Sequence, residues 1–220
     1  GYVVAFLISN LVLAVLTQAV FMTQAWLPLN PDNIPNMRWD TALHTMVSFL
    51  TNTNQQHYSG QAQLSYFAQM TGITGLQVIT PMMGLALAVA TLRALFMKPA
   101  SNDTGNAPVR VTVGNYYADV VRLCLRFLLP LCLVWTLLLN WQGVPSTLAA
   151  GPQATPIDAS AGMDTQKIPL GPVAAMVAAK QLGANGGGWY GNYDESFTRL
   201  YLAGGVTAMR TAGNVNGYTD

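Results

Sequence analysis

A short apolar run passes directly into an uncharged polar run at Val47-Ser48-Phe49-Leu50-Thr51-Asn52-Thr53-Asn54-Gln55-Gln56. Around it, residues 41–92 contain no Asp, Glu, Lys or Arg. Only 9% of the 220 residues are charged and 51% are hydrophobic, whereas a typical soluble domain has about a quarter charged residues. The net charge of +1 creates no field that would attract polyanions. This composition argues against a soluble enzyme, a disordered tail and a nucleic-acid binder, and favours a membrane protein.

Three apolar stretches are long enough, or nearly so, to cross a bilayer, whose core requires about 20 residues of helix. They cover residues 2–21, about 74–97 and about 123–141. The second and third contain Pro81 and Pro130, which membrane helices tolerate because neighbouring groups satisfy the freed carbonyl. We therefore predict three spanning helices.

The basic residues predict the orientation of these spans. Five of the ten Lys and Arg residues lie in 93–126, and only Arg38 lies between the first two spans. The positive-inside rule then places 93–126 and the N-terminus in the cytoplasm. Residues 23–73 and those from 142 onward are expected outside.

A pattern of span, short helix and polar loop occurs twice. After the first span, Asp40 is predicted to cap a short apolar helix that ends near Phe49, and an uncharged polar run follows at 51–60. After the third span, an alanine-rich helix is predicted over 173–182, followed by a polar, glycine-rich run at 183–188. The two units are offset by about 130 residues, and such internal repeats are typical of transporters and channels.

The two polar runs have the chemistry of a site for a small cation. A short helix directs the partly negative C-terminal end of its dipole at the loop that follows it, and loop carbonyls can replace the hydration shell of an ion. A helix N-terminus facing the site would instead favour anions. Solvated turns remain the simpler alternative for either run alone. Two other classes also stay open: a non-transporting membrane scaffold, and a membrane-embedded enzyme, for which only His44 and His57 supply titratable groups near the spans.

Two long motifs resemble the KdpA family, the potassium-binding subunits of the Kdp potassium-transporting ATPase. The first runs from Val47 through Asn54, with Gln56, to Tyr58-Ser59-Gly60, and the second from Gly171-Pro172-Val173-Ala174 to Gly186-Gly187-Gly188. The resemblance covers about residues 1–191. It implies an all-α, polytopic membrane protein of the superfamily built from four helix–pore-loop–helix repeats, with two of the four repeats present and the chain an N-terminal part.

The resemblance also implies which residues bind the ion. The first strip, 51–56, and the second strip, 183–188, would bind dehydrated K⁺ through backbone carbonyls. The implied ion-binding residues are Thr51, Asn52, Thr53, Asn54, Gln56, Gly183, Ala184, Asn185, Gly186 and Gly187. Two positions depart from the family's usual pattern, because Gln55 replaces Trp and Ala184 replaces Thr.

On this resemblance, the chain is a non-catalytic subunit in the bacterial inner membrane that transports K⁺. The implied partners are a P-type ATPase subunit that hydrolyses ATP, the KdpC protein and the small KdpF protein. An alternative is the pore subunit of another potassium transporter of the superfamily, one coupled to a cytoplasmic nucleotide-binding ring. We expect four regions: a first repeat at 1–97, a cytoplasmic loop at 98–122, a second repeat at 123–191, and a tail at 192–220 that does not resemble the family.

Overall fold

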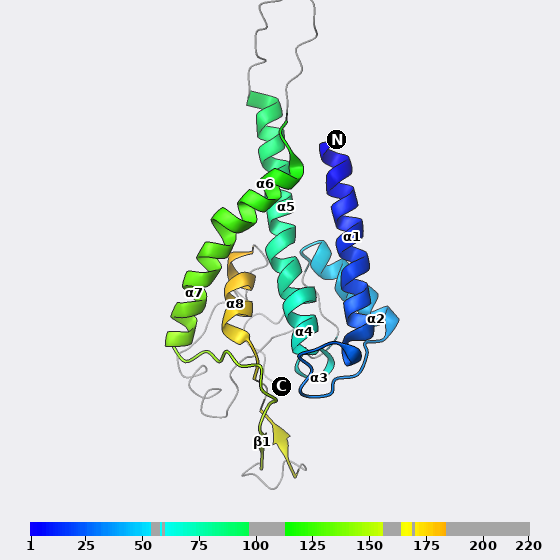
Figure 1. Cartoon of the computed structure of the whole chain (residues 1–220), viewed down its shortest axis with the longest axis vertical. Coiled ribbons are helices and arrows are strands. Elements are labelled where there is room, and N and C mark those ends of the chain that lie inside the picture. Colours follow the sequence, from blue (N-terminus) through cyan, green and yellow to red (C-terminus); the bar gives the residue numbers. More distant parts are fainter. Residues whose placement is uncertain (54–57, 59, 97–112, 156–163, 169, 184–220) are drawn as a thin grey trace, which may run out of the picture.

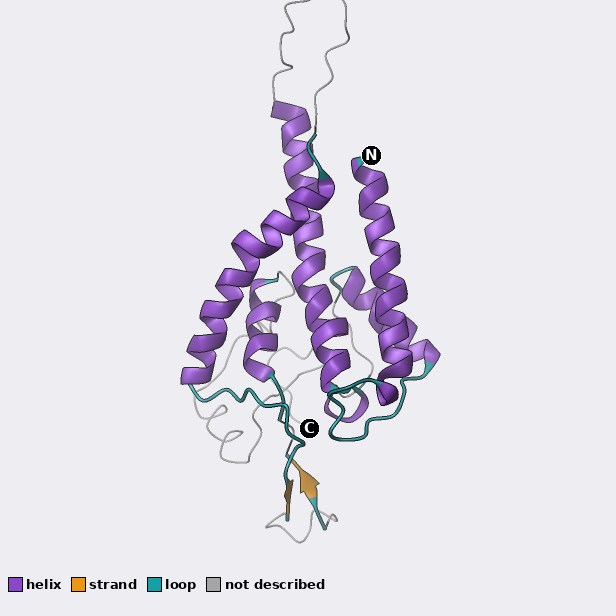
Figure 2. Cartoon of the chain, viewed as in Figure 1, coloured by secondary structure: helices purple, strands orange, loops and turns teal. Residues whose placement is uncertain are grey.

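The computed structural model describes residues 1–53, 58, 60–96, 113–155, 164–168 and 170–183. These residues are mostly helical, as Figure 2 shows. The elements are α1 (Tyr2–Thr23), the 3-10 turn η1 (Gln24–Trp26), α2 (Trp39–Leu50), α3 (Gly60–Gln63), α4 (Tyr66–Ala68), the π-helix η2 (Gln69–Thr74), α5 (Gly75–Phe96), α6 (Tyr116–Leu123), the π-helix η3 (Cys124–Leu128), α7 (Leu129–Trp141), β1 (Gln153–Ala154), β2 (Gln166–Lys167) and α8 (Val173–Leu182).

Three continuous helices in the described part of the chain are long and apolar enough to cross a membrane. They are Tyr2–Trp26, Tyr66–Phe96 and Tyr116–Trp141. The predicted number of spans and the all-α class are therefore confirmed. The strands are a small exception, since β1 and β2 pair antiparallel over only two residues each.

The third span begins at Tyr116, seven residues before the predicted start at Leu123. Asn115 caps this helix, because its Oδ1 accepts a hydrogen bond from the Ala118 N–H at 3.2 Å. The charged residues of this segment indicated a loop. Asp119, however, is only 6% exposed and pairs with Arg93 of α5, so its charge is compensated inside the protein.

The two short helices are α2 and α8. Helix α8 occupies the predicted residues 173–182, and α2 ends at Leu50, one residue beyond the prediction. Asp40 does not cap α2 as predicted. Arg38 is the N-cap residue, and Asp40 lies in the first turn, where its Oδ1 accepts a hydrogen bond from the Thr41 N–H at 2.8 Å. This bond lowers the pKa of the Asp40 carboxyl.

Helix α5 lies between α2 and α8 and contacts both (Figure 1). One core cluster joins α1 and α2 to the segment that leads into α5; it consists of Phe21, Met37, Ala42, Met46, Phe49, Leu64, Ala68, Ile73 and Leu76. A second cluster joins α5, η3, α7 and α8; it consists of Met82, Leu128, Cys132 and Ala179. Each short helix therefore packs against the long helix that precedes it in the chain, and both contact α5.

Gln24 holds the first repeat together at the end away from the N-terminus. It is completely buried. Its Nε2 donates hydrogen bonds to the carbonyls of Pro35 (2.7 Å) and Gln63 (2.8 Å), and its Oε1 accepts one from the Ser65 N–H (3.0 Å). One side chain thus connects the end of α1, the loop before α2 and the segment before α4.

Two contacts join the repeats at the same end. The Tyr66 hydroxyl lies 3.0 Å from the carbonyls of both Ala149 and Leu170, which belong to the second repeat. Lys167 of β2 forms an ion pair with Asp32 of the loop between α1 and α2. These contacts fix the segment that leads into α8 against the first repeat.

Candidate functional site

Helix α2 ends in a Schellman motif, which fixes the backbone at the start of the first strip. Asn52 adopts a left-handed conformation (φ 58°), which Asn tolerates better than most residues. Its N–H donates to the carbonyl of Phe49 at 3.4 Å, and the N–H of Thr53 donates to the carbonyl of Ser48 at 2.8 Å. These bonds occupy the carbonyls of Ser48 and Phe49, so we expect a carbonyl that binds a cation here to lie beyond Phe49.

The Asn52 side chain connects the first strip to α5. Its Oδ1 lies 2.7 Å from the Thr80 Oγ1, which is also 2.8 Å from the carbonyl of Leu76. A hydroxyl has one proton to donate, and it is shared between these two oxygens. The opposite orientation of the amide, with Nδ2 donating to Thr80 and Thr80 donating to Leu76, preserves the same link.

Gly183 connects the second strip to α5. Gly183 is the C-cap residue of α8, and its N–H donates the last helical hydrogen bond, to the carbonyl of Ala179 at 2.8 Å. A Cβ built on Gly183 would overlap the backbone carbonyl oxygen of Gln77 and would lie 2.7 Å from that of Ala179. The α-hydrogen in that position therefore points at the Gln77 oxygen, which is the geometry of a weak Cα–H···O contact.

The Gln77 carbonyl is available for this contact because of Pro81. In an α-helix the carbonyl of residue 77 would accept a hydrogen bond from the N–H of residue 81, and proline has none. Pro81 lies inside α5 and is buried. The sequence thus leaves one carbonyl of α5 without its helical donor at the point where α8 ends.

The beginnings of both strips therefore contact the same turn of α5, residues 77–80. Gln77 and Thr80 are 4% and 5% exposed, and residues three apart on a helix have Cβ atoms about 5–6 Å apart. At about 1.5 Å per residue, this turn lies about 17 Å from Tyr66 and about 24 Å from Phe96. The short helices α2 and α8 thus meet α5 well inside the span and not at its ends.

Four of the predicted ion-binding residues are described, namely Thr51, Asn52, Thr53 and Gly183. The hydroxyls of Thr51 and Thr53 lie 2.8 Å apart. The other predicted residues lie outside the described part of the chain: Asn54, Gln56, Ala184, Asn185, Gly186 and Gly187. In the described part, no group of three or more His, Cys, Asp and Glu residues is placed to hold a metal ion.

Sequence reasoning missed Gln77 and Thr80. A signal was present, since these two polar residues stand three apart in the otherwise apolar run 76–90, and Pro81 directly follows Thr80. Their contacts with Asn52 and Gly183 could not be read from this pattern, because they join residues far apart in the chain.

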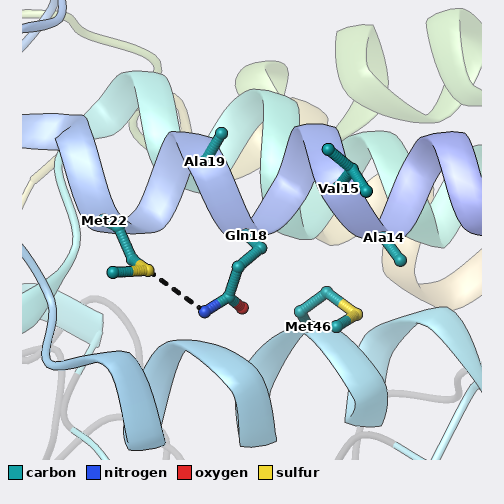
Figure 3. Close-up of a pocket in the computed structure, with 6 residues that line it drawn as sticks. All are labelled: Ala14, Val15, Gln18, Ala19, Met22 and Met46. Atoms are coloured by element: carbon teal, nitrogen blue, oxygen red, sulfur yellow. Dashed lines mark hydrogen bonds between the residues drawn. The ribbon is translucent and has the colours of Figure 1, made fainter.

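An apolar groove between α1 and α2 does not belong to this site. It is lined by Ala14, Val15, Gln18, Ala19, Met22 and Met46 (Figure 3). Its one polar side chain is Gln18, whose Nε2 donates to the Met22 sulfur at 3.2 Å. This lining offers no set of oxygens for a cation.

The chain is similar to known proteins over most of its length. A family model described as potassium-transporting ATPase A subunit (KdpA) matches residues 1–196. Proteins named potassium-transporting ATPase potassium-binding subunit are 46% identical in Pseudomonas putida and 44% identical in Synechocystis sp., each over 190 residues, which are 86% of this chain and 31% of the relative. The protein of that name in Gloeobacter violaceus is 40% identical over 199 residues, 87% of this chain and 32% of its own length. The chain thus spans about a third of these relatives, and it belongs to the KdpA family of potassium-transporting ATPases.

Proposed function

We propose that the chain contributes two strips of a K⁺ selectivity filter to the potassium-binding subunit of an ATP-driven uptake complex. One observation carries this proposal: the C-terminal ends of α2 and α8 meet the same turn of α5. Asn52, after α2, forms a hydrogen bond with Thr80, and Gly183, after α8, contacts the carbonyl of Gln77. Two partly negative helix ends inside a membrane favour a cation between the loops that follow them. The relatives' name, potassium-binding subunit, agrees with K⁺ as that cation.

The composition of the strips supports selection of the ion by carbonyls. Residues 51–56 and 183–188 contain no charged side chain that would hold a cation too tightly to release it. The Schellman bonds occupy the carbonyls of Ser48 and Phe49, so the oxygens offered to the ion lie beyond Phe49, toward the strip. In this mechanism K⁺ loses its hydration shell, and coordination number and field strength discriminate it from Na⁺.

The chain has a transporting and not a hydrolysing role in this proposal. A P-type ATPase subunit hydrolyses ATP, the KdpC and KdpF proteins complete the complex, and the assembly lies in the bacterial inner membrane. The three spans and the relatives' description as part of a potassium-transporting ATPase support this assignment.

Growth at limiting K⁺ tests the proposal. A bacterial host without other K⁺ uptake systems receives the full reading frame around this segment together with its neighbouring genes. Gly186→Asp adds a negative charge to the second strip. Ser146→Asp is the matched control, because Ser146 is exposed in the loop between α7 and α8 and the charge is added away from the strips.

We expect the unaltered protein and Ser146→Asp to restore growth at limiting K⁺. Gly186→Asp should fail to restore growth while the amount of assembled complex stays unchanged on a native gel. If Gly186→Asp restores growth as well as the control does, the second strip does not sense the ion and the filter assignment is wrong.

A further inference from the structure

We propose that Thr80 and Gln77 of α5 are positioning residues that determine the cation selectivity of both strips; this inference rests on the function proposed above. Neither residue belongs to a strip. Each is buried in the middle span. Thr80 contacts Asn52, the second residue of the first strip, and Gln77 contacts Gly183, the first residue of the second strip. A carbonyl filter distinguishes ions by the placement and number of its oxygens, so the groups that place the strips influence that choice.

Thr80 fixes the first strip relative to the span. The Schellman motif determines the backbone of Asn52 and Thr53 relative to α2, but it does not determine how far the end of α2 stands from α5. The link between Thr80 and the Asn52 amide does so, at 2.7 Å. Thr80 is itself held, because its Oγ1 also lies 2.8 Å from the Leu76 carbonyl of the preceding turn.

Gln77 fixes the second strip through its backbone. Because Pro81 removes the helical donor for the Gln77 carbonyl, this oxygen projects toward Gly183. Glycine is the residue that permits the approach. A methyl group at 183 would overlap the Gln77 oxygen and would also lie 2.7 Å from the Ala179 oxygen, so the end of α8 would be displaced from α5.

The two contacts share one rigid turn, which gives the strips a common reference. If α5 served only the packing of the spans, a change at Thr80 would alter the amount of assembled complex and not the ion that the complex prefers. A shared reference makes a different prediction, because a change at Thr80 then alters which ion is preferred in complexes that do assemble.

The test measures K⁺ uptake by cells that carry the full reading frame and its neighbouring genes. Thr80→Val preserves the shape of the side chain and removes the hydroxyl, and Thr80→Ser restores the hydroxyl. Thr91→Val is the matched control. Thr91 also lies in α5 and its hydroxyl also bonds the carbonyl four residues earlier, Leu87, at 2.9 Å, but it is exposed and far along the helix from Asn52.

We expect Thr80→Val to raise the KM for K⁺ by about 2- to 12-fold, the range that corresponds to one net hydrogen bond. The preference for K⁺ over Rb⁺ and Na⁺ should fall, and the maximal rate per assembled complex should be retained. Thr80→Ser and Thr91→Val should behave like the unaltered protein. An unchanged KM and preference in Thr80→Val would overturn the role of Thr80.

Asn52→Gly removes the same link from its exposed end and tolerates the positive φ. If the complex with Thr80→Val does not assemble, the KM and ion preference of Asn52→Gly test the role of the link between Asn52 and Thr80. The double variant Asn52→Gly/Thr80→Val should have the KM of the more severe single variant, because both remove one interaction. Additive effects would show that the two residues act separately. Gly183→Ala should lower the preference for K⁺ in the same way, and an unchanged preference would overturn the role of Gln77.

Gly186→Asp, measured in the same cells, separates the two proposals. If it leaves the KM and the ion preference unchanged, the filter function itself fails. If it alters them and neither Thr80→Val nor Gly183→Ala does, the filter function stands and the positioning role is wrong.

Discussion

The guanidinium of Arg93 and the carboxylate of Asp119 form a two-point ion pair between the second and third spans. Nη1 lies 2.5 Å from Oδ2, and Nη2 lies 3.2 Å from Oδ1. Tyr2 of the first span donates its hydroxyl to the same carboxylate at 3.1 Å. The left-handed Gly114 (φ 97°) makes room for the guanidinium, which would overlap a Cβ there. Three spans are thus connected through one buried acidic side chain.

Removing the cation of this ion pair should destabilise the protein more than removing its carboxylate. Arg93→Met leaves the Asp119 side chain, only 7% exposed, without its cation, and should cost about 3 kcal/mol. Asp119→Asn should cost less, because the Arg93 side chain is 31% exposed and can reach water. The double variant Arg93→Met/Asp119→Leu should recover much of the loss. Thermal unfolding of the detergent-solubilised protein measures all three.

The pair of Arg38 and Asp40 supplies the control for that experiment. Its side chains are 82% and 45% exposed, and exposed pairs contribute about 0–1 kcal/mol. Arg38→Met should therefore leave the unfolding temperature nearly unchanged. Equal losses for Arg93→Met and Arg38→Met would contradict the burial argument.

Gly72→Ala should destabilise the crossing of α1 and η2. A Cβ at Gly72 would lie 2.6 Å from Cε1 of Phe21, which is completely buried, and overpacking of this kind costs about 1–3 kcal/mol. Gly75→Ala is the matched control, since its Cβ would meet only the Met70 carbonyl at 3.7 Å. In thermal unfolding, Phe21→Leu should rescue Gly72→Ala; a stable Gly72→Ala would show that the ring moves aside freely.

Replacing Gln24 with Leu should strongly destabilise the end of the first repeat that lies away from the N-terminus. It leaves the Ser65 N–H and the carbonyls of Pro35 and Gln63 buried without their partner, and each such group costs about 1–3 kcal/mol. Gln142→Leu, at an exposed position after α7, should have little effect. Urea unfolding in detergent would compare them, and similar midpoints for the two variants would be evidence against the central role of Gln24.

Tyr66→Phe should loosen the contact between the repeats without unfolding either. The hydroxyl has one proton for the carbonyls of Ala149 and Leu170, so its loss should cost about one net hydrogen bond, about 1 kcal/mol. Limited proteolysis should cut residues 143–155 faster in this variant. Tyr117→Phe is the control, because Tyr117 is 53% exposed; equal cleavage of both variants would mean that Tyr66 does not hold this segment.

A helix was predicted correctly where the residues that begin and end it are visible in the sequence. Residues 173–182 form a helix as predicted because Pro172 stands before it and Gly183 after it. The third span was predicted too short because Asp119 and Arg122 have the polarity of a loop. Only the position of Arg93 in space shows that Asp119 is compensated.

The candidate site was predicted only in part for the same reason. The composition of the strips and the short helices before them are visible in the sequence. The turn of α5 that both strips meet is not, because the contact of Asn52 with Thr80 spans 28 residues and that of Gly183 with Gln77 spans the two repeats. Periodicity and composition describe neighbours along the chain and contain no information on such distant pairs.

Pro81 has a consequence for the order in which the protein is built. When the first repeat leaves the ribosome and enters the bilayer, its second span already has a carbonyl at Gln77 that lacks its regular helical donor, because residue 81 is a proline. An unsatisfied carbonyl in lipid is costly. The residue that covers it, Gly183, is synthesised only with the second repeat. The first repeat is thus synthesised before the contact at its Gln77 carbonyl can form, and that contact forms only when α8 and Gly183 follow.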